Sequence, residues 1–248
     1  MSTLTILRDG VNRALRPLGV QVVRGFTTDP GISPFLPARR TVAKAKRAGM
    51  SVGDYLDAYS AEPGATAATV DAMIELGGLD QRVSRVCEIG AGSGRYARKV
   101  LAALEPDVYE VYETAPDWRR FLRELPNVTV RPADGHTLRP TASASVDLVH
   151  AHKLFVYIPF IVTVGYLKEM ARVVRSGGVV AFDVITQDCV DEVVIKGWLS
   201  EPGSATIYSV TPREWAIDLL ARHGLALLGS RFVPLSGGRT ELLVFRRL

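Results

Sequence analysis

The pattern of apolar and polar positions changes near residue 80. Before this point, apolar residues recur at helical spacing over residues 4–16 and 65–76, and a third helix is expected over 51–59 with Ser51 as its N-cap. The Pro- and Gly-rich residues 29–37 read as a loop. No segment before residue 80 shows the alternation of apolar and polar residues that is typical of a strand. We therefore expect an N-terminal helical extension over residues 1–80, acting as a lid.

After residue 80, short apolar runs alternate with helical segments. The predicted strands cover residues 85–89, 108–113, 128–131, 146–151 and 179–185. The first helix between them is expected to end at about residue 104, and the next two cover about 116–124 and 161–174. Such alternation predicts a parallel sheet with right-handed crossovers. Ser176-Gly177-Gly178 is expected to turn the chain into the fifth strand.

The C-terminal part follows a different pattern. Thr211-Pro212 predicts a helix start, with Thr211 as N-cap and Pro212 at the first helical position, and the helix is expected to end at Gly224. Two strands, 226–233 and 241–245, then form a predicted hairpin. The fold class is therefore α/β, with a mostly parallel sheet and a C-terminal antiparallel hairpin. Residues 81–248 are expected to form one domain.

Composition is that of a globular protein. Of 248 residues, 47% are apolar, which is enough for a full core. The sequence shows no signal peptide and no apolar run of the roughly 20 residues that a membrane helix needs, so membrane insertion is not expected. Cys87 lies in a predicted central strand, as a buried free thiol would. These features favour a cytoplasmic protein.

Positive charge is concentrated near the N-terminus. Residues 1–50 hold nine Arg and Lys against two Asp, and five of them, Arg39, Arg40, Lys44, Lys46 and Arg47, lie on a further short helix that is predicted to end near Gly49. A solvated helix face is the simplest explanation. Contact with an anionic surface, a substrate or a partner subunit, as in a homodimer, is the alternative. Nucleic-acid binding is not expected, because no aromatic residues interleave with the basic ones.

A glycine-rich loop joins the first predicted strand to its helix. Gly90, Gly92 and Gly94 permit a tight turn and close approach to a ligand, and the following helix start offers free N–H groups. A dinucleotide fingerprint would need glycine at the sixth position of the motif, where Arg95 stands, which argues against NAD and FAD. A plain structural turn is the alternative.

Two acids follow later strands at useful places. Glu113 ends the second predicted strand, where a carboxylate can accept both ribose hydroxyls of a nucleoside. Glu110 competes by spacing, but the turn after Glu113 places Glu113 at the carboxyl edge of the sheet. Asp134-Gly135 follows the third strand and can reach an adenine amino group, unless it is an ordinary Asp-Gly turn.

The segment from Val86 to Tyr96 resembles motif I of class I S-adenosylmethionine (SAM)-dependent methyltransferases. Later motifs match in order: Glu113, Asp134-Gly135, Asp147-Leu148-Val149 and Arg175-Ser176-Gly177-Gly178, in which Ser176 replaces the commoner proline. The resemblance covers about residues 83–248 and implies a Rossmann-like fold with SAM across the carboxyl ends of strands one to four. It implies cofactor contacts from Glu88, Gly90, Ala91, Gly92, Glu113, Asp134, Gly135 and His150. Glu113 would hold the ribose and Asp134 the adenine.

Two histidines follow the fourth strand and suit the acceptor side. His150 and His152 are two apart, so both face the same side if the strand continues. A hydroxyl acceptor must lose a proton, and histidine is the side chain best suited to accept one near neutral pH. We expect His152 to be the general base, with His150 as the alternative or as a donor contact. Either could instead be a structural histidine satisfied by hydrogen bonds, and Lys153 could orient an acceptor oxygen.

A metal site and a covering segment complete the expectations. Mg²⁺ would need carboxylates, and Asp183 and Asp188 flank the end of the fifth strand without forming a known motif, so no obligatory metal is expected. The segment from Trp198 to Tyr208 is expected to cover the acceptor. Tyr55 or Tyr59 could close the other side against the cofactor, although aromatic residues there are more often core.

A finer resemblance points to the acceptor. Segments Gly49–Tyr55, Pro63–Thr66 and His152-Lys153 look like those of actinobacterial methyltransferases linked to polysaccharide or glycoside tailoring, which include enzymes making mycobacterial methylmannose polysaccharides. The expectation is a SAM-dependent O-methyltransferase acting on a saccharide hydroxyl, with an oligosaccharide acceptor. The alternatives are a natural-product or lipid methyltransferase, and a SAM-binding protein without catalytic activity.

Overall fold

The structure is a computed structural model that describes residues 11, 14–15, 37–60, 62–79, 81–200, 209–235 and 238–248, leaving aside the side chains of 60 and 197–200. Most of the predicted helix over 4–16, most of the loop over 29–37 and residues 201–208 of the expected acceptor cover lie outside this part of the chain.

Helices and strands alternate from residue 85 onward, as the sequence predicts. The N-terminal helices are α2 (Ala38–Arg47), α3 (Val52–Ser60) and α4 (Ala65–Gly77). The strands are β1 (Arg85–Ile89), β2 (Val108–Tyr112), β3 (Val128–Arg131), β4 (Val146–Ala151), β5 (Val174–Val184), β6 (Leu225–Leu235) and β7 (Gly238–Arg247). The other helices are α5 (Arg95–Leu104), α6 (Pro116–Leu122), α7 (Phe160–Val173), the 3₁₀ turn η2 (Gln187–Cys189), α8 (Glu192–Ser200) and α9 (Arg213–Arg222).

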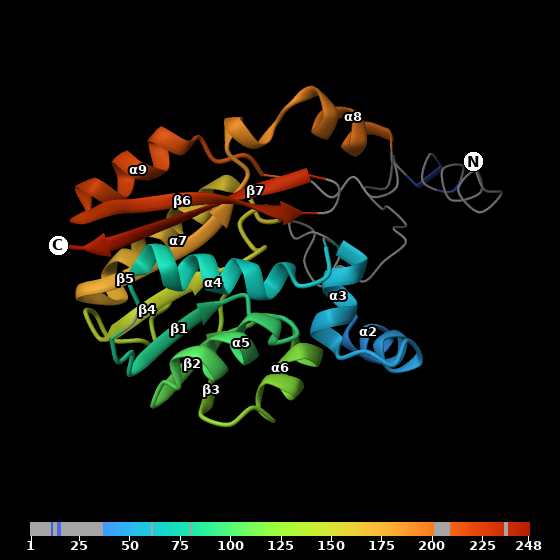
Figure 1. Cartoon of the computed structure of the whole chain (residues 1–248), viewed down its shortest axis with the longest axis horizontal. Coiled ribbons are helices and arrows are strands. Elements are labelled where there is room, and N and C mark those ends of the chain that lie inside the picture. Colours follow the sequence, from blue (N-terminus) through green and yellow to red (C-terminus); the bar gives the residue numbers. More distant parts are fainter. Residues whose placement is uncertain are drawn as a thin grey trace.

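The seven strands form one sheet in the order β3-β2-β1-β4-β5-β7-β6 (Figure 1). The five strands from β3 to β5 run parallel, and β7 is antiparallel to both β5 and β6. The order reverses between β1 and β4, and crevices for ligands form at such switch points at the carboxyl ends of the strands. The glycine loop begins at this point.

Helices cover both faces of the sheet because its strands carry apolar side chains on both sides. Helices α4 and α5 pack on one face against strand residues such as Val86 and Leu148. Helices α7 and α9 pack on the other against Cys87 and Val149, one position along each strand. Cys87 is fully buried, as expected. Figure 1 shows α4 and α5 in front of the sheet and α7 behind it.

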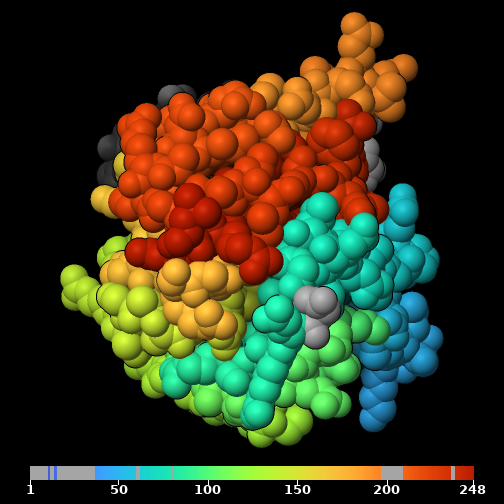
Figure 2. Space-filling model, turned by 60° about the vertical axis from the view of Figure 1, so that its left-hand side comes forward, coloured from blue at the N-terminus to red at the C-terminus, as the bar shows by residue number. Residues whose placement is uncertain are grey.

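The N-terminal helices meet this core in two ways. Helix α4 packs on α5, β6 and β7, and the Arg246 guanidinium donates to the Gly77 carbonyl at 2.6 Å. Helices α2 and α3 project from one side in Figure 2, and the Ala38 N–H donates to the Asp117 carboxylate of α6 at 2.8 Å. The division of the chain at residue 80 stays a prediction, and α4 packs as part of the helical layer.

Two local expectations were wrong. Strand β5 begins at Val174, so Ser176-Gly177-Gly178 lies inside it instead of preceding it. Helix α9 has Pro212 as N-cap and begins at Arg213. The reason is that the Thr211 N–H donates to the Ile185 carbonyl at 2.8 Å, which keeps Thr211 extended beside the end of β5. The Ser51 cap is confirmed, since its Oγ accepts the Asp54 N–H at 3.1 Å.

Candidate active site

The glycine loop turns through three left-handed positions. Gly90, Gly92 and Gly94 have φ of 71°, 52° and 72°, a region that side chains with a Cβ rarely adopt. A Cβ on Gly90 would lie 3.0 Å from the Leu154 side chain, whereas the nearest atom to a Cβ on Gly92 is the Gly90 carbonyl oxygen at 3.9 Å. Gly90 is therefore needed for packing, and Gly92 leaves open space where a ligand can approach the backbone.

Glu113 lies against this loop. Its Oε2 accepts the Gly92 N–H at 2.7 Å, and its Oε1 accepts the Ala115 N–H at 2.7 Å. The side chain is nearly buried, and burial raises the pKa of Glu113 although the backbone donors oppose this shift. Each oxygen accepts one of these bonds and keeps a lone pair for another donor, such as a hydroxyl.

The competing acid, Glu110, is occupied by structural contacts. Its carboxylate forms ion pairs with Arg131 at 2.7 Å and Arg85 at 3.0 Å. It also accepts a hydrogen bond from the Thr141 hydroxyl. Despite burial, these partners lower the pKa of Glu110. This geometry favours Glu113 as the acid of the ligand site.

Asp134 caps its own turn. Its Oδ1 accepts the N–H groups of His136 at 3.0 Å and Thr137 at 2.7 Å, and its Oδ2 accepts the Thr137 hydroxyl at 2.5 Å. These bonds outweigh burial and lower the pKa of Asp134 to about 2. Gly135 has φ of 86°. Asp134 and Gly135 therefore form an Asp-Gly turn, and the Asp134 side chain is still 40% exposed.

A buried polar row crosses the sheet beneath the loop. Glu88 of β1 and His150 of β4 are cross-strand neighbours, and the Tyr109 hydroxyl of β2 lies 2.7 Å from Glu88 Oε2 and 2.8 Å from His150 Nε2. Burial raises the pKa of Glu88 to about 8. Burial also holds the pKa of His150 well below its usual value, with His152 adding to the effect. The His150 ring is therefore neutral, fully buried and tied to Tyr109.

His152 continues this row at the carboxyl end of β4. Its Nδ1 lies 3.3 Å from Asp183 Oδ1, close but not aligned for a hydrogen bond, and its ring stacks on Tyr96 of α5 with 4.6 Å between centroids. Burial lowers the pKa of His152, and Asp183 partly offsets this. The two histidines thus face the same side of the sheet, as predicted, but their surroundings differ.

Lys153 completes the cluster. Its N–H donates to Asp183 Oδ1 at 2.9 Å, and its ammonium lies 3.1 Å from Asp183 Oδ2 and donates to the Thr240 hydroxyl at 2.6 Å. It has φ of 52°, unusual for lysine. Although burial alone would favour the neutral acid, Lys153 and His152 hold the pKa of Asp183 well below its usual value. From the sequence, Asp183 was a candidate only as a metal ligand, and its pairing with Lys153 and His152 was not predicted.

The remaining candidates lie on η2 and α3. Asp188 lies in η2, while Asp183 is committed to Lys153 and His152. Among the described residues, no group of three or more His, Cys, Asp or Glu could hold a metal ion. Tyr55 and Tyr59 stack on each other in α3, and Tyr59 is exposed. Within the same part of the chain, no helix is long and apolar enough to cross a membrane.

Comparisons with known proteins agree with this architecture. Residues 87–182 match the family model described as a methyltransferase domain. No curated protein matched the sequence. A solved chain from the complex between the Haloferax volcanii Trm112 methyltransferase activator and a proposed methyltransferase is 14% identical, with a TM-score of 0.61, and the match covers 85% of this chain and 98% of that one.

Two other solved structures are similar. An O-methyltransferase family protein from Burkholderia thailandensis is 20% identical, with a TM-score of 0.60, and the match covers 86% of this chain and 63% of that one. Magnesium protoporphyrin IX methyltransferase from Synechocystis PCC 6803, solved with bound SAH, is 11% identical, with a TM-score of 0.56, and the match covers 98% and 99%.

The fold is therefore the Rossmann-like fold of class I methyltransferases, mostly parallel with antiparallel C-terminal strands. Within it, residues 87–182, from the glycine-loop strand to β5, are similar to a methyltransferase domain.

Proposed function

We propose that this protein is a SAM-dependent O-methyltransferase that methylates a saccharide hydroxyl, with His152 as the general base. The observation that carries the proposal is the contact between the glycine loop and Glu113, whose carboxylate holds the Gly92 N–H at 2.7 Å. SAM, when bound, supplies an electrophilic methyl group, and the rest of the chemistry is positioning and proton removal.

The donor side fits the groups that SAM presents. The open space at Gly92 lets the backbone approach the ligand, and the free lone pairs of Glu113 can accept ribose hydroxyls. Asp134 remains the proposed contact for the adenine amino group, through the exposed part of its carboxylate. Glu88, Ala91, Gly135 and His150 are proposed as further contacts around the same ligand.

The acceptor side supports His152 over His150 as the base. Asp183 lies beside His152 Nδ1 and so favours a proton on that nitrogen. In this tautomer Nε2 is free to accept a proton from the acceptor. His150 has its Nε2 against Tyr109, deeper in the row. Because the His152 ring is also buried, base action requires the ring or Tyr96 to move when an acceptor binds.

The proposal is tested with labelled SAM and a panel of neutral and anionic oligosaccharides of graded size, lipids and aromatic compounds, followed by mass analysis of the products. We expect methylated saccharide from the wild-type protein. The His152→Gln variant should keep its SAM affinity and lose most turnover. The matched His150→Gln variant should lose less turnover than His152→Gln. Unchanged turnover in His152→Gln would remove this residue as the base, and product only from lipid or aromatic acceptors would exclude the saccharide.

A further inference from the structure

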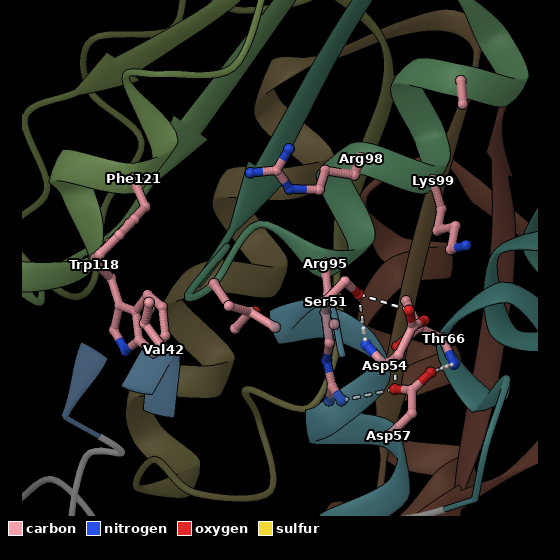
Figure 3. A pocket seen from close by; sticks show the side chains of 14 residues that line it. Val42, Ser51, Asp54, Asp57, Thr66, Arg95, Arg98, Lys99, Trp118 and Phe121 are labelled. Carbon is pink, nitrogen blue, oxygen red and sulfur yellow. Dashed lines mark hydrogen bonds and ion pairs between the residues drawn. The ribbon is translucent and has the colours of Figure 1, made fainter. Parts of the chain in front are cut away.

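A pocket of about 390 Å³ opens on the outer side of the glycine loop, between α5, α6 and the N-terminal helices α2 and α3 (Figure 3). Its wall includes Ser93 of the loop, Arg95, Arg98 and Lys99 of α5, and Trp118 and Phe121 of α6. In Figure 3 the Arg98 side chain extends toward Phe121 and Trp118, whereas the Lys99 side chain extends away from them.

The three basic residues share one face of α5. Arg95 precedes Arg98 by three residues and Lys99 by four, so it neighbours both on the helix surface, and like charges at these spacings destabilise a helix. They also occupy its first turns, where the partial positive charge of the helix start favours acids, yet the first turn holds none. This arrangement is unfavourable for the isolated helix and favourable for a bound anion.

The acids of the pocket wall neutralise only one of these three charges, that of Arg95. Asp57 pairs with Arg95 at 2.9 Å and accepts two hydrogen bonds from Thr66, and Asp54 accepts the Ser51 hydroxyl at 2.7 Å. In the part of the chain that the structure describes, no acid lies within ion-pair distance of Arg98 or Lys99. Apolar walls from α2 and α6 strengthen the field of these two cations inside the pocket.

We propose that this pocket binds the anionic group of the acceptor, and that the acceptor is a saccharide carrying a phosphate or a carboxylate. The guanidinium of Arg98 can hold two oxygens of such a group, and Lys99 adds a point charge. Ser93 lines the pocket and lies between Gly92 and Gly94, so the anion binds next to the donor loop. That the bound anion belongs to the methyl acceptor rests on the proposed function, whereas the binding of an anion in this pocket does not.

The test is calorimetric titration of the full chain, without SAM, with glucose 1-phosphate, glucuronate and glucose. We expect saturable binding of at least one charged probe, weaker at high salt, and no binding of glucose. The probe that binds identifies the anionic group. In the Arg98→Gln, Lys99→Gln variant, Kd should rise at least about tenfold, because two charged contacts are lost.

A matched variant controls for general charge. Lys168→Gln with Arg222→Gln removes the same charge from exposed positions on α7 and α9, and its Kd should stay within about twofold of wild type. The inference is overturned if neither charged probe binds, if glucose binds as tightly, or if both double variants lose affinity equally. SAM affinity of the wild-type protein is measured as well: a protein that binds the charged probe but not SAM would contradict the proposed donor site and leave this inference standing.

Discussion

Replacing Asp183 with asparagine would remove one buried charge while keeping the shape of the side chain. Asp183 is fully buried, and the side chain of Lys153, whose ammonium lies beside it, is only 9% exposed. An asparagine oxygen can still accept the Lys153 N–H, which lies 2.9 Å from Asp183 Oδ1. The main change is therefore electrostatic, because the variant leaves a buried ammonium without its counter-charge.

The size of the effect follows from this geometry. At 3.1 Å, two unit charges attract by about 5 kcal/mol with an effective dielectric constant of about 20. Removing one partner of a buried pair costs about 3–5 kcal/mol, so we expect Asp183→Asn to lower the free energy of unfolding by that amount. Urea unfolding at neutral pH, with an unchanged slope, measures it.

The pH dependence and a second variant sharpen this test. Burial lowers the pKa of Lys153 and Asp183 raises it, so the pKa falls further in the variant. A depressed lysine pKa costs stability while the unfolded chain is protonated, so the deficit should shrink as pH rises toward the usual lysine pKa. Asp183→Asn with Lys153→Met should recover most of the loss. A loss below about 1 kcal/mol, or no recovery in the double variant, would refute the reasoning.

Two further predictions concern the loop strand. Gly90→Ala should destabilise the fold by about 2–4 kcal/mol in urea unfolding, because it adds left-handed strain and a close contact with Leu154. Gly49→Ala, at a similar φ but in open space, should cost only about 1–2 kcal/mol. Equal losses would contradict the packing role of Gly90. The raised pKa of Glu88 means that its folded form retains a proton which the unfolded chain releases, so wild-type stability should fall from pH 4.5 toward about 8, and Glu88→Gln should flatten this fall; an unchanged profile would contradict the assignment.

Much of the fold could be predicted because most of its strands have a clear local sequence pattern. Strands β1, β3 and β4 have the predicted bounds, since each is a short run of strand-forming residues ended by a turn or loop. The two-residue alternation also placed His150 and His152 on one face. The start of α9 was misplaced by one residue, because the bond from Thr211 to Ile185 joins segments 26 residues apart and leaves no local pattern.

The candidate site was predictable only in part. The glycine loop and Glu113 follow a spacing that can be seen in the sequence, and the structure brings them into contact. The partnership of Asp183 with His152 and Lys153 depends on β4 pairing with β5, which spacing alone does not reveal. The pocket at Arg98 and Lys99 depends on how α2 and α3 dock beside α6, which is a matter of tertiary packing.

The central claim is that the glycine loop and Glu113 together bind SAM, and calorimetric titration with SAM and with its demethylated product SAH tests it most directly. We predict saturable one-to-one binding of both, weakened at least about tenfold in Glu113→Gln by the loss of charged hydrogen bonds to ribose. The matched Glu124→Gln variant, changed at an exposed acid outside the site, should bind as the wild type does. No heat of binding with the wild-type protein, or equal affinity in Glu113→Gln, would contradict the claim.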